Sequence, residues 1–203
     1  FREFAMPIDV RIKPHPAFEW RLWDARGDVP VESGWRLDAV TVRRYQADNE
    51  LLRALALLEL VEVNDVALKL ASQKALTMEF TVMPMGTLAM FTSAPSVKVN
   101  ERLRNEDSRI LAAVLAHELR HFEDYMRGIL VAGPTGCLDA EIRAVNREAE
   151  TWTRLVGSRG LHPEPSRLAQ IENYRATVYA DGAEAIEGLV NRLYREACGH
   201  TVN

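Results

Sequence analysis

The strongest constraint on the fold is an apolar run at 111–116, Leu-Ala-Ala-Val-Leu-Ala, which leads directly into His117-Glu118-Leu119-Arg120-His121. Four residues around it recur at spacings of four, three and four, the period of one helical face: Ile110, Val114, His117 and His121. Polar residues at 105–108 are typical of a helix N-terminus, and Gly128 is typical of a helix end. We therefore predict a helix whose apolar face packs into the core, with the two histidines where that buried face ends.

The two histidines have the spacing of metal ligands. Residues four apart on a helix lie one turn apart on the same face, so His117 and His121 can direct imidazole nitrogens at one tetrahedral ion. Glu118 points beside such an ion, where a carboxylate can take a proton from a metal-bound water. The alternative is that both histidines are exposed helix residues among charged neighbours. The spacing favours a zinc site with Glu118 as its general base.

A catalytic zinc site needs a third protein ligand, for which Glu141 is the best candidate. Its helix carries an apolar stripe at helical spacing: Leu138, Ile142, Val145, Ala149, Trp152 and Leu155. Glu141 lies on this stripe, where a carboxylate is costly unless it is paired or bound to metal. The alternative is a glutamate at the start of the helix that interacts with the helix dipole. Glu148, two turns further along, is either a rival ligand or an acceptor that orients a ligating imidazole.

These residues resemble a known family. The spacing His117-Glu118-x-x-His121, then 19 residues, then Glu141 is similar to that of the gluzincins, the thermolysin-like branch of the zincin peptidases. The stretch 86–152 also resembles uncharacterised bacterial metallopeptidase-like proteins. The resemblance implies one Zn²⁺ bound by His117, His121 and Glu141, with Glu118 as general base. Val145 stands where the thermolysin-like pattern has an acid, so the surroundings of the ligands must be built differently.

The function that this resemblance implies is hydrolysis of peptide bonds in a peptide or protein substrate. Zinc would lower the pKa of its bound water towards ~7, and Glu118 would pass the proton to the leaving amine. Five side chains without a motif are candidates for the oxyanion donor: Tyr125, His162, Tyr174, Tyr179 and His200. The second hypothesis is a regulatory or interaction module that binds zinc without efficient turnover. The third is a helical interaction protein without metal, which zinc content would separate from the other two.

The rest of the chain predicts an α+β, zincin-like fold, mostly helical with a small antiparallel sheet beside the metal helix. Residues 87–92 and 96–100 have the pattern of short strands, one of which could receive an extended substrate by edge pairing. Residues 47–73 predict one helix or two with a break at Asn64-Asp65, packed behind the metal helix. Residues 128–136 predict a loop, and 166–180 and 183–198 predict helices. We expect residues 1–45 to form a strand-rich segment and residues 46–203 to form the zincin-like domain, in one compact unit overall.

Composition limits the partners. The net charge is −4 and the basic residues are scattered among acids, so we expect no nucleic-acid binding. No apolar run approaches the ~20 residues of a transmembrane helix, so we expect a soluble protein, cytoplasmic in preference to exported. The first residues do not have the pattern of a signal peptide, although a chain that begins with Phe leaves export open. Cys137 and Cys198 form either one disulfide or two free thiols.

Overall fold

The computed structural model describes residues 46–61, 65–73, 76–93, 95–130, 132–156 and 166–199. The strand-rich segment predicted at 1–45 lies outside these ranges. The helices are α2 (Asn49–Val61), α3 (Val66–Gln73), α4 (Ser108–Met126), α5 (Pro134–Val156), α6 (Arg167–Ala180) and α7 (Ala183–Tyr194), with a short 3₁₀ turn η1 at Glu101–Leu103. The strands are β1 (Gln46–Ala47), β2 (Thr77–Thr81), β3 (Ala89–Thr92) and β4 (Ser96–Asn100). This content confirms an α+β protein that is mostly helical.

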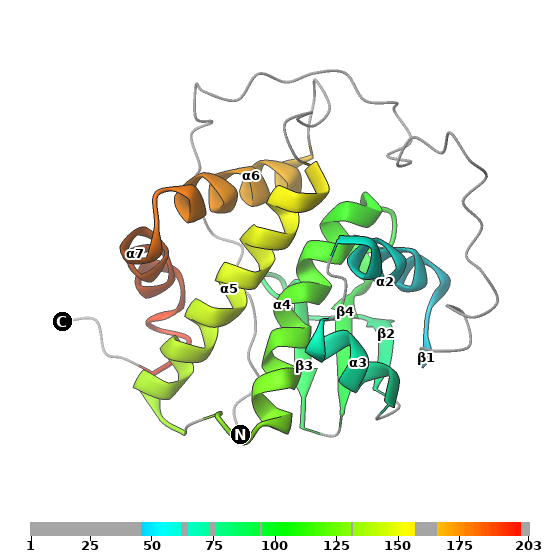
Figure 1. The fold of residues 1–203 in the computed structure, drawn as a ribbon, viewed down its shortest axis with the longest axis horizontal. Helices are drawn as coiled ribbons and strands as arrows, with labels where there is room; N and C mark the ends of the chain where they lie inside the picture. Colours follow the sequence, from blue (N-terminus) through cyan, green and yellow to red (C-terminus); the bar gives the residue numbers. More distant parts are fainter. Residues whose placement is uncertain are drawn as a thin grey trace.

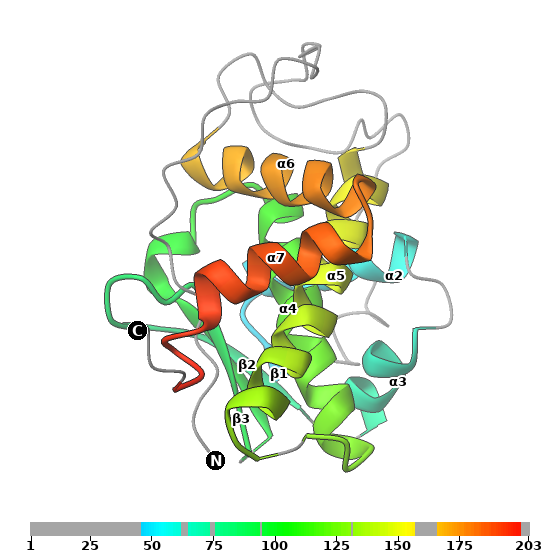
Figure 2. The ribbon, with the colours of Figure 1, turned by 90° about the vertical axis from the view of Figure 1, so that its left-hand side faces the viewer.

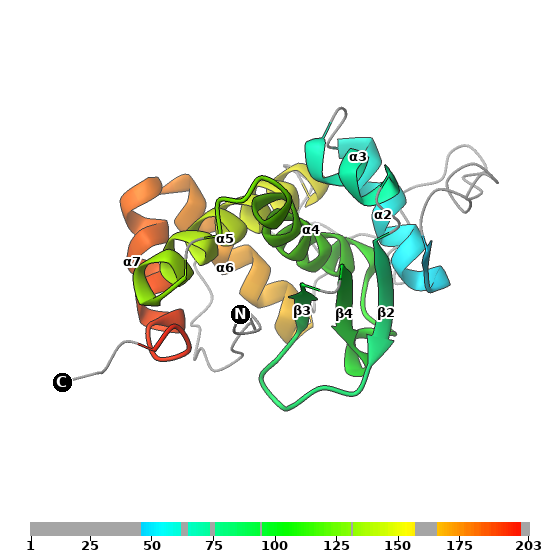
Figure 3. The same cartoon turned by 90° about the horizontal axis from the view of Figure 1, so that it is seen from below.

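The helix α4 lies at the centre of the molecule (Figure 1). The strands and α2 lie on one side of it, and α5 lies along its other side (Figure 3). The helices α6 and α7 pack on α5 and on each other (Figure 2). The prediction that residues 47–73 pack behind the metal helix is confirmed, in its form of two helices, because both α2 and α3 contact α4. Among the described residues, no helix is both long enough and apolar enough to cross a bilayer.

The sheet is mixed, so the prediction of an antiparallel sheet is wrong. Its strand order is β1-β2-β4-β3, with β1, β2 and β4 parallel and only β3 antiparallel to its neighbour β4. The sequence pattern identifies β3 and β4 but not β2, whose five residues show only one fully buried side chain, Met78. Strand direction has no signature in side-chain alternation, since parallel and antiparallel strands share the period of two. Because β3 stands last in the strand order, it is an edge strand of the described sheet, and it contacts α4.

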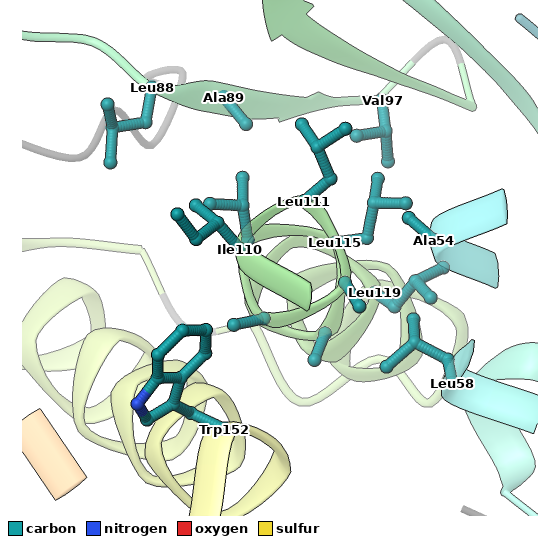
Figure 4. Close-up of a cluster of buried hydrophobic side chains, with 14 of the residues drawn as sticks. Ala54, Leu58, Leu88, Ala89, Val97, Ile110, Leu111, Leu115, Leu119 and Trp152 are labelled. Carbon is teal, nitrogen blue, oxygen red and sulfur yellow. The ribbon is translucent and has the colours of Figure 1, made fainter. Parts of the chain in front are cut away.

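The core is centred on α4. Leu111, Leu115 and Leu119 recur every four residues and are buried towards the sheet and α2, while Trp152 of α5 packs on another side (Figure 4). Burying one leucine contributes about 1.5–3 kcal/mol, so this stripe alone holds α4 firmly between its neighbours. The indole nitrogen of Trp152 donates a hydrogen bond of 3.0 Å to Asn173 on α6, which ties α6 to the same core.

The helix boundaries differ from the predictions at one important place. The helix α4 begins as predicted, with the Asp107 carboxylate accepting from the backbone N–H of Arg109, and it ends before Gly128 at φ 67°. The helix α5, however, begins at Pro134, so the loop ends at Gly133 and not at 136. Proline is favoured in the first turn because its missing N–H has no helical partner there. Glu141 therefore lies about two turns inside α5 and not at its start.

Candidate metal centre

The structure brings His117 and His121 of α4 together with Glu141 of α5. The two imidazole Nε2 atoms lie 3.1 Å apart. Glu141 Oε2 lies 3.4 Å from His117 Nε2, and Glu141 Oε1 lies 3.5 Å from His121 Nε2. Donor atoms bound at about 2.0–2.2 Å to a tetrahedral zinc ion are roughly 3.3–3.5 Å apart. The separations of 3.1–3.5 Å between the imidazole nitrogens and the carboxylate oxygens are close to this range, so the three side chains could hold one ion between them.

Glu148 holds the orientation of His117. Its Oε2 atom lies 3.1 Å from His117 Nδ1, and it is not part of the three-ligand group. A carboxylate only accepts hydrogen bonds, so Nδ1 carries a proton, and it is Nε2 that offers a lone pair towards His121 and Glu141 once its own proton is lost. Of the two roles that the sequence left open for Glu148, the geometry matches the orienting acceptor.

Behind Glu148 lies a charged cluster from α6. Arg175 Nη1 donates to Glu148 Oε1 and also donates over 2.9 Å to Glu172 Oε1. All three side chains are buried. Burial raises the pKa of Glu148, but the Arg175 charge and the contact with His117 outweigh it and lower that pKa. Burial together with the Glu148 charge raises the pKa of Glu172 to about 8, so Glu148 is the carboxylate that Arg175 holds ionised.

Glu118 is fixed at one oxygen only. Its Oε2 accepts a hydrogen bond of 2.7 Å from the backbone N–H of Phe91 on the edge strand β3. Its Oε1 is buried without a hydrogen-bond partner among the described residues. Burial raises the pKa of Glu118 to about 8 in the protein without metal. The Glu118 side chain thus has one oxygen anchored on β3 and one oxygen without a partner in the described structure.

The buried histidines and glutamates shift one another's pKa values, and a bound cation would compensate the negative charge of the glutamates. Burial raises the pKa of Glu141, and burial together with His117 lowers the pKa of His121 well below its usual value. Burial also lowers the pKa of His117, but hydrogen bonds that its ring donates to Glu141 and Glu148 outweigh this effect and raise that pKa to about 10. With this pKa both ring nitrogens of His117 are protonated near neutral pH. The imidazolium then supplies the positive charge that a bound divalent ion would otherwise supply.

Tyr194, at the end of α7, is a candidate site residue that the sequence analysis missed. Its hydroxyl oxygen is buried and has no hydrogen-bond partner among the described residues. Burial raises the pKa of Tyr194 well above its usual value, and the charge of Glu141 raises it further. The signal was present in the sequence, because Tyr194 continues the apolar stripe of Ile186 and Val190, and a tyrosine on a buried stripe needs a partner for its hydroxyl.

Of the five side chains considered as oxyanion donors, three are described, all of them tyrosines with other surroundings. Tyr125 packs its ring against Phe91, and the Tyr174 hydroxyl lies 3.5 Å from exposed Arg192. Tyr179 is only partly buried, at the edge of the core. His162 and His200 fall outside the described residues. None of the three described tyrosines therefore matches Tyr194 in burial together with an unsatisfied hydroxyl.

A disulfide joins Cys137 to Cys198, which settles the alternative left open for the two cysteines. Cys137 lies one turn before Glu141 on α5, and Cys198 lies one turn after Tyr194, whose carbonyl accepts from the Cys198 N–H over 2.8 Å. The bond therefore connects the turn that carries Glu141 to the turn that carries Tyr194.

The sequence predicted that the two histidines lie where the buried face of α4 ends, and this prediction is wrong. The helix is buried on nearly all sides, and His117 and His121 are 1% and 0% exposed. The reason is that α5, α6 and β3 cover the face that the charged residues of α4 suggested would meet solvent. Asp124 illustrates this, because it is buried and accepts a hydrogen bond of 2.7 Å from Arg143 of α5. The alternative of two exposed histidines therefore fails.

Comparisons of the chain with protein-family models, with curated proteins and with solved structures find no match. The functional argument therefore rests on the geometry of the site.

Proposed function

We propose that this protein is a zinc-dependent hydrolase of peptide bonds, with His117, His121 and Glu141 as ligands of one Zn²⁺. The observation that carries the proposal is the close approach of three buried side chains: the two Nε2 atoms lie 3.1 Å apart, and the two Glu141 oxygens lie 3.4 Å from His117 Nε2 and 3.5 Å from His121 Nε2. Two imidazoles and one carboxylate form a donor set suited to zinc. Three protein ligands leave a fourth position, which is the arrangement of catalytic zinc sites. The resemblance to the gluzincins points the same way.

The bound ion would supply a Lewis acid and a water molecule made acidic enough to react near neutral pH. Glu118 is the group that takes and returns the proton. Its Oε1 has no hydrogen-bond partner in the described part of the chain, and the Phe91 N–H opposes rotation of the carboxylate. A glutamate with this arrangement has no use in a site that only stores metal.

Tyr194 is the donor that we assign to the developing negative charge of the substrate. Its buried hydroxyl senses the charges of Glu141 and Glu118 and has no hydrogen-bond partner in the described structure. Its raised pKa keeps the hydroxyl proton in place, as a hydrogen-bond donor requires.

The edge strand β3 is the candidate binding strand for the substrate backbone. The N–H of Asn100 donates to the carbonyl of Leu88, and in an antiparallel pair the hydrogen-bonded positions alternate. Ala89 and Phe91 therefore direct their backbone groups away from β4, and the Phe91 N–H does so towards Glu118. An extended peptide could pair with the remaining groups of this edge, next to the proposed zinc.

The test is hydrolysis of a mixed peptide library by zinc-loaded protein, read by mass spectrometry. Wild type should generate new termini, and Glu118→Gln should retain zinc and generate none. Hydrolysis that persists in Glu118→Gln would remove the proposed base. If both proteins bind zinc and neither cleaves any peptide, the result would favour a zinc-binding module without turnover.

The second candidate is a zinc-binding module without turnover. The observation that favours it is burial, since His121 and Glu118 are 0% exposed and closed sites are typical of structural zinc. A structural site should raise the unfolding temperature on zinc binding and leave every peptide of the library intact.

The disulfide bears on the compartment. The sequence alone favours the cytoplasm, whereas a disulfide between two such distant cysteines is typical of oxidising compartments. We therefore propose that the protein functions where the Cys137–Cys198 bond persists.

A further inference from the structure

A buried arginine lies behind the proposed metal centre and has no part in the ligand set or in the proton transfer. Arg175 comes from α6, while His117 comes from α4 and Glu148 from α5. Arginine is rarely found fully buried unless it is paired, and Arg175 is only 2% exposed. Removing a guanidinium charge from water costs free energy, so we expect a role of Arg175 other than a surface ion pair.

The contacts of Glu148 divide its two oxygens between two helices. Oε1 accepts from Arg175, and Oε2 faces His117 Nδ1 at 3.1 Å. These two contacts together oppose rotation of the carboxylate about its last bond. The Arg175 guanidinium is planar and holds Glu172 over 2.9 Å at the same time, so it is itself anchored within α6.

We propose that Arg175 is a positioning residue of the metal centre, which acts through Glu148 to hold the His117 Nε2 lone pair towards the zinc position. The inference rests on the proposed zinc site. A fixed Glu148 keeps the imidazole proton on Nδ1 and the ring in one orientation. Without Arg175, the buried Glu148 loses its counter-charge, the carboxyl turns off Nδ1, and His117 no longer presents Nε2 to the ion.

Outer partners of a ligating histidine typically change metal affinity 10–100-fold, which sets the expected size of the effect. The experiment measures the zinc dissociation constant by competition with a chelating dye for wild type, Arg175→Met, Glu148→Gln and the double variant. Arg175→Met should weaken zinc about 10–100-fold in the wild-type background. In the Glu148→Gln background it should change the constant less than about threefold, because residues acting through one another are not additive.

Arg109→Met is the matched control. Arg109 is equally buried at 2% exposed and is paired with Asp107, but it lies two turns before the ligands at the start of α4. It should lower the unfolding temperature and leave the zinc dissociation constant within about twofold. Should Arg175→Met fail to fold, Arg175→Lys serves in the same cycle, with a smaller loss of roughly tenfold or less.

An unchanged zinc constant in Arg175→Met, or the same loss in both backgrounds, would overturn the positioning role while leaving the zinc site intact. A wild-type protein that binds no zinc would overturn the site and the inference together. The wild-type titration tells these failures apart.

Discussion

Removing the Cys137–Cys198 bond should destabilise the protein by about 4 kcal/mol. The bond closes a loop with a sequence separation of 61 residues. In the chain-entropy account the loss is about 2.1 cal/mol/K plus 1.5R times the logarithm of the loop length, or ~14 cal/mol/K. At 25 °C this gives roughly 4 kcal/mol, within the usual range of about 2–5 kcal/mol for a native disulfide. For a chain of this size the unfolding temperature should fall by roughly 8–16 °C.

The assay is equilibrium urea unfolding of the double variant Cys137→Ser/Cys198→Ser, compared with oxidised wild type. Both proteins must be free of metal, because a ligand that binds only the folded state adds its own stabilisation. Wild type reduced with a phosphine is the control, and it should unfold at the same urea concentration as the double variant. A loss below about 1 kcal/mol, or a loss in the double variant that reduction does not reproduce, would refute the reasoning.

Three further predictions concern the site. Glu141→Ala should abolish stoichiometric zinc binding, whereas Glu148→Ala should weaken it only ~10–100-fold. Equilibrium dialysis measures both. If Glu148→Ala loses zinc and Glu141→Ala keeps it, Glu148 is the ligand and Glu141 is not. Tyr194→Phe should retain zinc and lower kcat about 10²–10³-fold, the usual effect of removing one oxyanion donor, with Tyr125→Phe as the control; an unchanged kcat would remove Tyr194 from the mechanism. Zinc binding near pH 7.5 should release at least one proton per ion, because the pKa of His117 is about 10 without metal and the bound imidazole must give up its Nε2 proton. Calorimetry in two buffers of different ionisation enthalpy measures this release, and a value of zero would contradict the raised pKa.

The part of the site that lies on helical periodicity could be predicted from the sequence. His117 and His121 are four residues apart, so their proximity follows from the helix alone. Glu141 was identified because it lies on the apolar stripe of its own helix. Its position inside α5 was misjudged, because Gly133-Pro134 was interpreted as loop whereas Pro134 starts the helix.

The remaining partners could not be predicted, because they come from packing between distant segments. The Phe91 N–H reaches Glu118 across 27 residues of chain, and Arg175 reaches Glu148 across another 27. Every residue except proline has a backbone N–H, so the residue type at position 91 does not indicate that its N–H is the donor to Glu118. Strand β2 was not identified from the sequence, and its parallel pairing with β4 makes the sheet mixed where an antiparallel sheet was predicted.

The metal content of purified protein tests the central claim most directly. Plasma mass spectrometry of wild type, Glu118→Gln and His121→Ala after zinc-replete purification should give about one zinc per chain in the first two proteins and none in the third. No zinc in the wild type, or about one zinc in His121→Ala, would contradict the account.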